Sequence, residues 1–158
     1  MIELRVYKSR RLLEAAEADR VLFRAPVTLG SAPLGHKQQE GDGCTPEGRY
    51  RVCTRNEASR FHLALGLSYP NAADGEAALA AGRISAAQAD DIRAAEENGQ
   101  RPPWDTALGG AIMLHGQRPD KPWDPEDDWT AGCVSLRNED MDRLWDLCPL
   151  GTPVTILP

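Results

Sequence analysis

The chain has 158 residues, of which 41% are hydrophobic, and a formal net charge of -6. This length and composition suit one compact domain with a sizeable core, so we expect a single domain over residues 1–158. The acidic balance disfavours nucleic acid and anionic lipid as partners, because both would be repelled. No stretch approaches the roughly 20 apolar residues that cross a bilayer, which argues against membrane insertion.

The first residues, 1–6, lack the basic, apolar and small-residue regions of a signal peptide. A chain from which a leader had already been removed would also lack these regions. Nothing in the sequence predicts the oligomeric state.

The cysteines and histidines do not form a metal motif. There are four cysteines and three histidines, with no Cys-x-x-Cys pair among them, so we expect no metal site and no cofactor. Four cysteines are too few for a disulfide scaffold in a chain of this length. For Cys44 and Cys53, a pair across a loop and two inert thiols both remain open.

The first half of the chain reads as strands separated by one long loop. Residues 2–7 alternate apolar and polar side chains, and residues 61–69 do the same almost without error until Pro70. A turn-rich loop is expected over 31–48. Further strand patterns occur at 12–13, 21–23, 25–29, 49–53, 111–114, 134–136 and 154–157.

The second half adds helices. A helical insert is expected at about 74–105, with Gly82 separating two helices and a capping box at 85–88 opening the second. Asn138 is expected to cap one late helix that ends at Gly151. The predicted fold is therefore mainly β, an antiparallel sandwich or partly closed barrel with a helical insert and one C-terminal helix.

Cys133 and His115 are the candidates for chemistry. A cysteine attacks an amide as a thiolate, and a nearby histidine is a common way to generate one. His115 ends an apolar strand and precedes Gly116, which leaves room for substrate or for a carbonyl that orients the ring. The amides of Gly132 and Cys133 are candidates for holding the carbonyl oxygen. Taken alone, a cysteine or a strand-end histidine is more often a packing residue.

The combination resembles a known signature. Residues 115–116 (HG) and 130–135 (TAGCVS) are similar to the catalytic motif of the L,D-transpeptidase catalytic domain, the YkuD family. Residues 41–50 (GDGCTPEGRY) resemble another element of that family, and residues 59–62 and 68–71 resemble its YafK-like subgroup. Two positions depart from the usual pattern: Ala131 stands where most members have a second histidine, and Ser135 where most have an arginine.

The resemblance implies a peptidoglycan L,D-transpeptidase. Cys133 would form an acyl-enzyme at the diaminopimelate carbonyl of a tetrapeptide stem and pass it to an amine, with His115, Gly116 and Gly132 assisting. Two alternatives stand beside this reading: a cysteine hydrolase, acting as L,D-carboxypeptidase or endopeptidase on wall peptides or protein-wall links, and a catalytically silent wall-binding module.

Peptidoglycan stem peptides are the implied partner, and the cell envelope or periplasm is the implied location. The missing signal peptide keeps a cytoplasmic protein open as well. Exposed basic residues are candidates for holding a substrate carboxylate, with simple solvation as the alternative. The expected substrate-binding residues are Thr130, Arg137, Tyr69 and Trp129.

Overall fold

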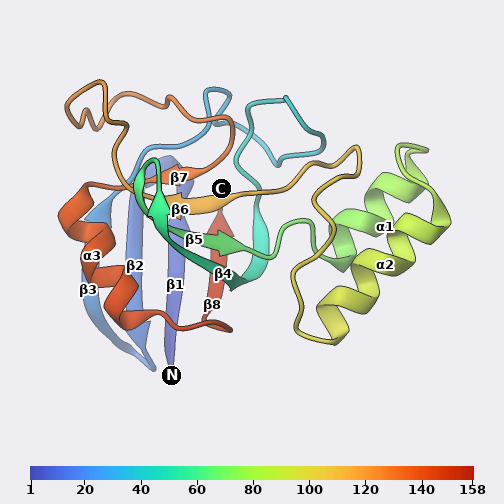
Figure 1. The fold of residues 1–158 in the computed structure, drawn as a ribbon, viewed down its shortest axis with the longest axis horizontal. Coiled ribbons are helices and arrows are strands. Elements are labelled where there is room, and N and C mark those ends of the chain that lie inside the picture. Colours follow the sequence, from blue (N-terminus) through green and yellow to red (C-terminus); the bar gives the residue numbers. More distant parts are fainter.

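The computed structural model describes all residues 1–158 as one mixed sheet with three α-helices (Figure 1). A single 3-10 turn, η1, covers Lys8–Arg10. The helices are α1 (Ala72–Ala80), α2 (Ala86–Glu97) and α3 (Asn138–Leu147). The strands are β1 (Ile2–Tyr7), β2 (Leu12–Glu17), β3 (Arg20–Pro26), β4 (Gly48–Ser59), β5 (His62–Leu67), β6 (Met113–His115), β7 (Val134–Ser135) and β8 (Pro153–Leu157).

The eight strands follow the order β3-β2-β1-β8-β4-β5-β6-β7. Neighbours are antiparallel except for the pairs β1–β8 and β6–β7, which are parallel. The chain beyond β3 then reaches the opposite edge of the sheet, because isolated bridges join Thr28 to Ser135 and Gly30 to Thr130. These bridges make the sheet a partly closed barrel, so the predicted mainly-β fold is confirmed, with two parallel pairs that the pattern did not indicate.

The apolar alternation of β1 explains its position near the middle of the sheet. Leu4 and Val6 are fully buried, and in β2 they face Ala15 and Leu13. A strand side chain repeats its direction every second residue, so one face of β1 points into the core throughout. The resulting core is a single cluster of 27 buried residues.

The helical insert lies beyond one end of the sheet in Figure 1. Its helices begin where their side chains satisfy the first free amides: Asn71 caps α1 and Ser85 caps α2, each within a reciprocal capping box. The second box was predicted, and α1 begins slightly earlier than expected because of the first. Ile92 of α2 is fully buried in the same core cluster as the strands, so the insert packs onto the barrel.

The start of α3 differs from the prediction. Arg137 occupies the N-cap position and makes no side-chain capping bond, while Asn138 is the first residue of the helix. The Asn138 Oδ1 atom accepts the backbone N–H of Gln117 at 2.9 Å instead. The side-chain oxygen that was expected to cap α3 therefore accepts a hydrogen bond from a loop that is distant in sequence.

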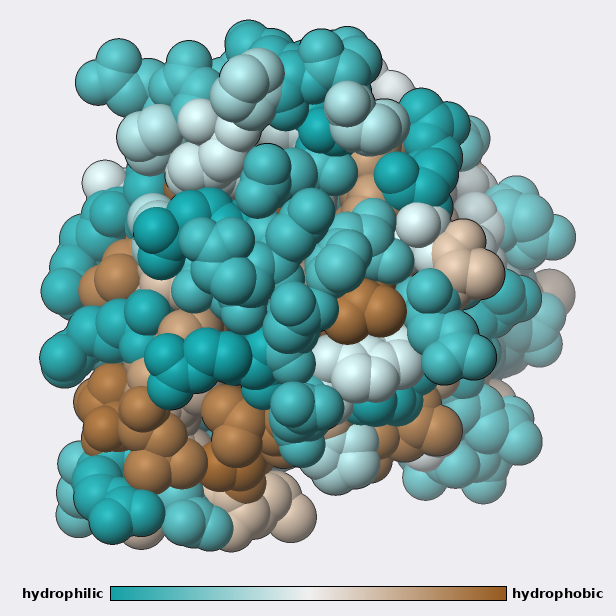
Figure 2. Space-filling model, turned by 60° about the vertical axis from the view of Figure 1, so that its left-hand side comes forward, coloured by the Kyte–Doolittle hydropathy of each residue, from teal (hydrophilic) through white to brown (hydrophobic).

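Hydrophilic side chains cover much of the face that Figure 2 shows, and hydrophobic ones gather in its lower part. None of the three helices combines the length and apolar character needed to span a bilayer.

Candidate active site

His115 ends β6, and Cys133 lies directly before the neighbouring strand β7 at the edge of the sheet. In the parallel pair β6–β7, His115 is in register with Ser135, and Cys133 directly precedes β7. The backbone N–H of Met113, two residues before His115, donates to the Cys133 sulfur at 3.3 Å. The structure thus brings the two predicted segments together, and the hydrogen bonds of the thiol go to backbone atoms.

The Cys133 thiol is held in its protonated form. Burial raises its pKa, and this outweighs the opposing effects of the Met113 N–H and the Lys37 ammonium. The S–H group donates to the carbonyl oxygen of Ala111 at 3.4 Å. Ala111 has a left-handed backbone with φ of 55°, a conformation that is found often at functional sites. The residue remains half-buried, so solvent reaches it.

The His115 imidazole is a neutral base with a defined tautomer. Its Nδ1 lies 2.8 Å from the carbonyl oxygen of Gly116, and a carbonyl only accepts, so Nδ1 carries the proton and Nε2 keeps its lone pair. No protein group bonds to Nε2. Burial lowers the pKa of this imidazole, against a smaller opposing effect of the Gly116 bond. At neutral pH the ring is therefore uncharged and ready to accept a proton.

Gly116 is the point on which the imidazole is oriented. Its carbonyl oxygen also accepts the Ser135 hydroxyl at 3.0 Å, and its N–H donates to the Phe61 carbonyl at 2.7 Å. A Cβ at this position would lie 2.5 Å from Asn138 Oδ1, so only glycine fits. Of the two roles anticipated for Gly116, the structure shows the carbonyl that orients the ring.

Two aromatic rings shield the imidazole. Phe61, at the β4–β5 turn, stacks on His115 with ring centres 4.5 Å apart, and Trp129 lies at 5.4 Å. His115 is 3% exposed as a result. The strand alternation placed Phe61 on the apolar face of a predicted strand, and no local signal connected it with the site. The β4–β5 hairpin brings its ring to the imidazole.

The turn before the nucleophile differs from the expectation for the oxyanion donors. The Gly132 N–H donates to Thr130 Oγ1 at 3.1 Å, and the Thr130 hydroxyl donates to the Cys133 carbonyl at 2.6 Å. The Gly132 amide is therefore occupied, whereas the Cys133 N–H has no acceptor in the protein. Thr130, expected to bind substrate, is buried and stabilises this turn.

Two other residues that were expected to bind substrate are bonded to groups of the protein itself. Tyr69, expected to bind substrate, is fully buried and donates its hydroxyl to the Leu108 carbonyl at 3.0 Å, so its side chain is not open to a substrate. Arg137 is half-buried and pairs with Asp140 at 2.8 Å. Among the four candidates, Trp129 is the one that contacts the imidazole.

The loop before β4 packs against the turn that carries Cys133. The Lys37 ammonium is buried and bonds Asp42 at 2.9 Å and the Gln39 carbonyl at 3.1 Å. The same loop packs against the turn, because a Cβ on Gly132 would lie 2.7 Å from the Cys44 carbonyl. Sequence reasoning did not identify Lys37, whose only signal was its place just before the 41–50 motif.

No group of three or more His, Cys, Asp or Glu side chains is arranged to hold a metal ion. All four cysteines are unpaired. Cys44 and Cys53 are thus free thiols.

Comparison with known proteins gives one family. The model of the L,D-transpeptidase catalytic domain (YkuD) matches residues 2–156. No curated protein matches.

Solved structures share the fold at low identity. The helical cell shape determining protein Pgp2 from Campylobacter jejuni is 20% identical with a TM-score of 0.65, over 98% of this chain and 46% of that one. Bd1075 from Bdellovibrio bacteriovorus is 23% identical with a TM-score of 0.60, over 99% and 47%. The transpeptidase LdtMt1, solved in complex with imipenem, is 12% identical with a TM-score of 0.56, over 99% and 58%. The chain spans about half the length of these proteins.

Proposed function

The chain belongs to the family of L,D-transpeptidase catalytic domains, and from that membership we propose that it acts on peptidoglycan stem peptides with Cys133 as nucleophile and His115 as base. The observation that carries this proposal is the state of the imidazole. The ring is buried and its Nδ1 proton is bonded to Gly116, so its free lone pair is on Nε2. His115 belongs to β6, and the residue after Cys133 begins the paired strand β7.

The first half of the reaction forms a thioester. Nε2 of His115 takes the thiol proton as the Cys133 sulfur attacks the carbonyl carbon of diaminopimelate, and the carbonyl oxygen becomes an oxyanion. The Cys133 N–H, which has no other acceptor, donates to that oxyanion. The tetrahedral intermediate collapses when the imidazolium returns the proton to the departing D-alanine amine.

The second half transfers the acyl group. An acceptor amine gives a proton to Nε2 and attacks the thioester carbon, which releases the Cys133 thiolate to be reprotonated. If water enters in place of the amine, the same steps make a carboxypeptidase. Cys133 is half-buried, and Phe61 and Trp129 shield the imidazole. Both features support the proposal, because solvent and substrate can reach the residue while little water reaches the base.

The neutral thiol and imidazole distinguish this site from a preformed ion pair. Burial raises the pKa of Cys133 and lowers that of His115. Proton transfer therefore accompanies the attack and does not precede it. The oxyanion donor must supply much of the stabilisation, typically about 3 kcal/mol for one good hydrogen bond.

Incubation with defined tetrapeptide muropeptides, followed by mass spectrometry, tests the proposal. Release of D-alanine together with crosslinked dimers indicates a transpeptidase, and release without dimers indicates the hydrolase. Both activities should disappear in Cys133→Ala and persist in the control Cys53→Ala, which removes another half-buried thiol.

A carbapenem separates an enzyme from a silent wall-binding module. Imipenem should add its mass to the wild-type protein and to Cys53→Ala, but not to Cys133→Ala. Absence of both the adduct and any muropeptide product, in a folded protein, would overturn the proposed chemistry in favour of the silent module.

A further inference from the structure

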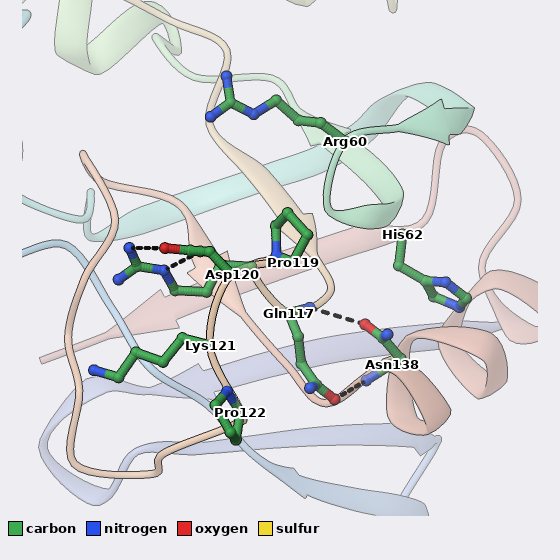
Figure 3. A pocket seen from close by; sticks show the side chains of 9 residues that line it. Arg60, His62, Gln117, Pro119, Asp120, Lys121, Pro122 and Asn138 are labelled. Carbon is green, nitrogen blue, oxygen red and sulfur yellow. Dashed lines mark hydrogen bonds and ion pairs between the residues drawn. The ribbon is translucent and has the colours of Figure 1, made fainter.

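Residues 117–129 lie between the His115-Gly116 pair and the turn that carries Cys133, and we call them the β6–β7 loop. The first part of this loop borders a polar cleft of about 550 Å³ (Figure 3). At its start, the side-chain oxygens of Gln117 and Asn138 each accept the backbone N–H of the other residue, at 2.9 and 3.1 Å. The loop is therefore attached to α3 at its first residue.

The middle of the β6–β7 loop is held by ion pairs on its surface. Asp120, labelled in Figure 3, pairs with Arg118 at 2.8 Å, and Lys121 pairs with Asp127 at 2.6 Å. All four residues belong to the loop. These pairs therefore join the loop to itself and do not attach it to the barrel.

Asp128 attaches the end of the loop to the barrel. Its Oδ2 accepts a hydrogen bond from Arg11 Nη2 at 2.7 Å, and its Oδ1 accepts the Arg11 Nε–H at 3.1 Å and the Leu29 N–H at 2.9 Å. Arg11 is part of the barrel, because its carbonyl oxygen accepts the Val27 N–H at 3.0 Å. The side chain of Asp128 is 18% exposed, against 64% for Asp120. Solvent therefore screens this pair less than the pairs on the loop surface.

Trp129 lies between two hydrogen bonds to a single buried residue. The N–H of Leu29 donates to Asp128, before the tryptophan, and the Leu29 carbonyl accepts the Thr130 N–H at 3.3 Å, after it. These two bonds hold the backbone of Trp129 on both sides. Its ring centre lies 5.4 Å from that of the His115 imidazole.

We propose that Asp128 is a positioning residue that sets the Trp129 ring over the His115 imidazole. Its bonds to Arg11 and to the Leu29 N–H supply the anchor. The use of this anchor in catalysis rests on the proposed function, in which the imidazole is the base. A ring held in this place keeps water from the imidazole and limits its movement.

An NMR titration of the imidazoles tests the proposal without substrate. The chain has three histidines, and the resonance of His115 is identified by its loss in His115→Gln. Burial lowers the pKa of His115, and no charged side chain contributes to that change. Asp128→Ala should raise the titration midpoint of His115 toward the ordinary value of about 6.5, because water reaches the imidazole once Trp129 is no longer held.

The sign of the shift separates positioning from a direct effect of charge. A carboxylate stabilises an imidazolium, so losing the charge of Asp128 would by itself lower the midpoint of His115. Loss of shielding raises it. An upward shift therefore identifies the lost position of the Trp129 ring.

Asp120→Ala is the matched control. Asp120 also binds an arginine through both of its oxygens, at 2.8 and 2.9 Å, but its partner Arg118 belongs to the same loop. The control removes the same charge and leaves the anchor to the barrel intact, and Arg118 keeps Asp127 at 4.0 Å. The His115 midpoint should equal that of the wild type.

Two further variants test the route through the ring. Trp129→Leu removes the ring and should raise the His115 midpoint, and adding Asp128→Ala to it should not raise the midpoint further, because Asp128 acts through that ring. Arg11→Gln keeps the Leu29 bond and should give a smaller rise. It reports on the anchor even if Asp128→Ala does not fold.

The outcomes separate the anchor from the chemistry. A His115 midpoint in folded Asp128→Ala that equals or falls below the wild-type value would overturn the proposal, and so would an equal rise in Asp120→Ala. With the tetrapeptide, kcat of Asp128→Ala should fall about threefold to tenfold while Asp120→Ala matches the wild type; equal kcat values in an active protein would overturn the role in catalysis. If the wild type releases no D-alanine, the proposed function fails and the titration still decides on the anchor.

Discussion

Asp42 holds together the loop that packs against the Cys133 turn, and its removal should destabilise the protein in a pH-dependent way. Its Oδ1 accepts the Lys37 ammonium at 2.9 Å and the Cys44 N–H at 3.1 Å, while Oδ2 accepts the N–H groups of Gln38 and Gln39 at 2.8 and 3.0 Å. Burial raises the pKa of this carboxyl, but the hydrogen bonds together outweigh it and lower the pKa from 3.8 to about 2.

The magnitude follows from that change in pKa. At about 1.4 kcal/mol per pKa unit, the charged form contributes roughly 2 kcal/mol to the free energy of unfolding. Asp42→Asn also leaves the buried Lys37 ammonium without its counterion. We therefore expect a loss of about 3 kcal/mol at pH 7, which corresponds to a Tm lower by roughly 6–12 °C.

The pH dependence has a definite sign. A carboxyl whose folded pKa is depressed contributes its stability above its ordinary pKa and loses it as the pH falls through the folded value. The difference between wild type and Asp42→Asn should therefore be full above about pH 5 and shrink toward pH 2.

Urea unfolding followed by tryptophan fluorescence at pH 7, 5, 4 and 3 measures this difference. Asp91→Asn is the control, since Asp91 is exposed on α2 and makes no ion pair. The reasoning is refuted if Asp42→Asn unfolds within about 0.5 kcal/mol of wild type at pH 7, or if the difference is the same at pH 7 and pH 3.

Three further outcomes are expected around the nucleophile. Burial raises the pKa of Cys133, so its alkylation by iodoacetamide, read by peptide mass, should have a midpoint above the ordinary thiol value of about 8.5; a midpoint below that value would contradict the burial argument. Ser135→Ala removes one of the two bonds to the Gly116 carbonyl and should lower kcat about threefold to tenfold with little change in KM, and an unchanged kcat would mean that the hydroxyl does not help to position the imidazole. Gly132→Ala would place a Cβ 2.7 Å from the Cys44 carbonyl at a φ of 144° and should lower the free energy of unfolding by about 3 kcal/mol in urea; a loss below about 1 kcal/mol would show that the loop yields easily.

Much of the architecture could be predicted because it is encoded locally. The alternation in residues 2–7 and 61–69 predicted strands, and the capping box at 85–88 predicted the start of α2. Such signals involve residues a few positions apart, whose backbone preferences and hydrogen bonds are settled within the segment. The closure of the barrel by the Thr28–Ser135 bridge was not indicated, since its partners are far apart in the chain.

The candidate site shows the same division. The small-residue context of Cys133 and the Gly116 that follows His115 were visible in the sequence. The structure places His115 on β6 and Cys133 directly before the paired strand β7. The sequence did not indicate that Phe61 would cover the imidazole or that Thr130 would occupy the Gly132 amide. Both depend on which groups a folded chain brings within reach.

The sequence by itself determined the mainly-β class and the helical insert, and it predicted Cys133 and His115 as the candidates for chemistry. Only the tertiary structure decided which nitrogen of His115 keeps a free lone pair, and which amide, that of Cys133, has no acceptor in the protein. It also decided that Asn138 Oδ1 bonds the backbone of Gln117 where a helix cap was expected. The physical reason is competition for hydrogen bonds. Each polar group can bond either to a neighbour in its own segment or to a group on a distant segment. The packing of the folded chain decides which of these partners it meets.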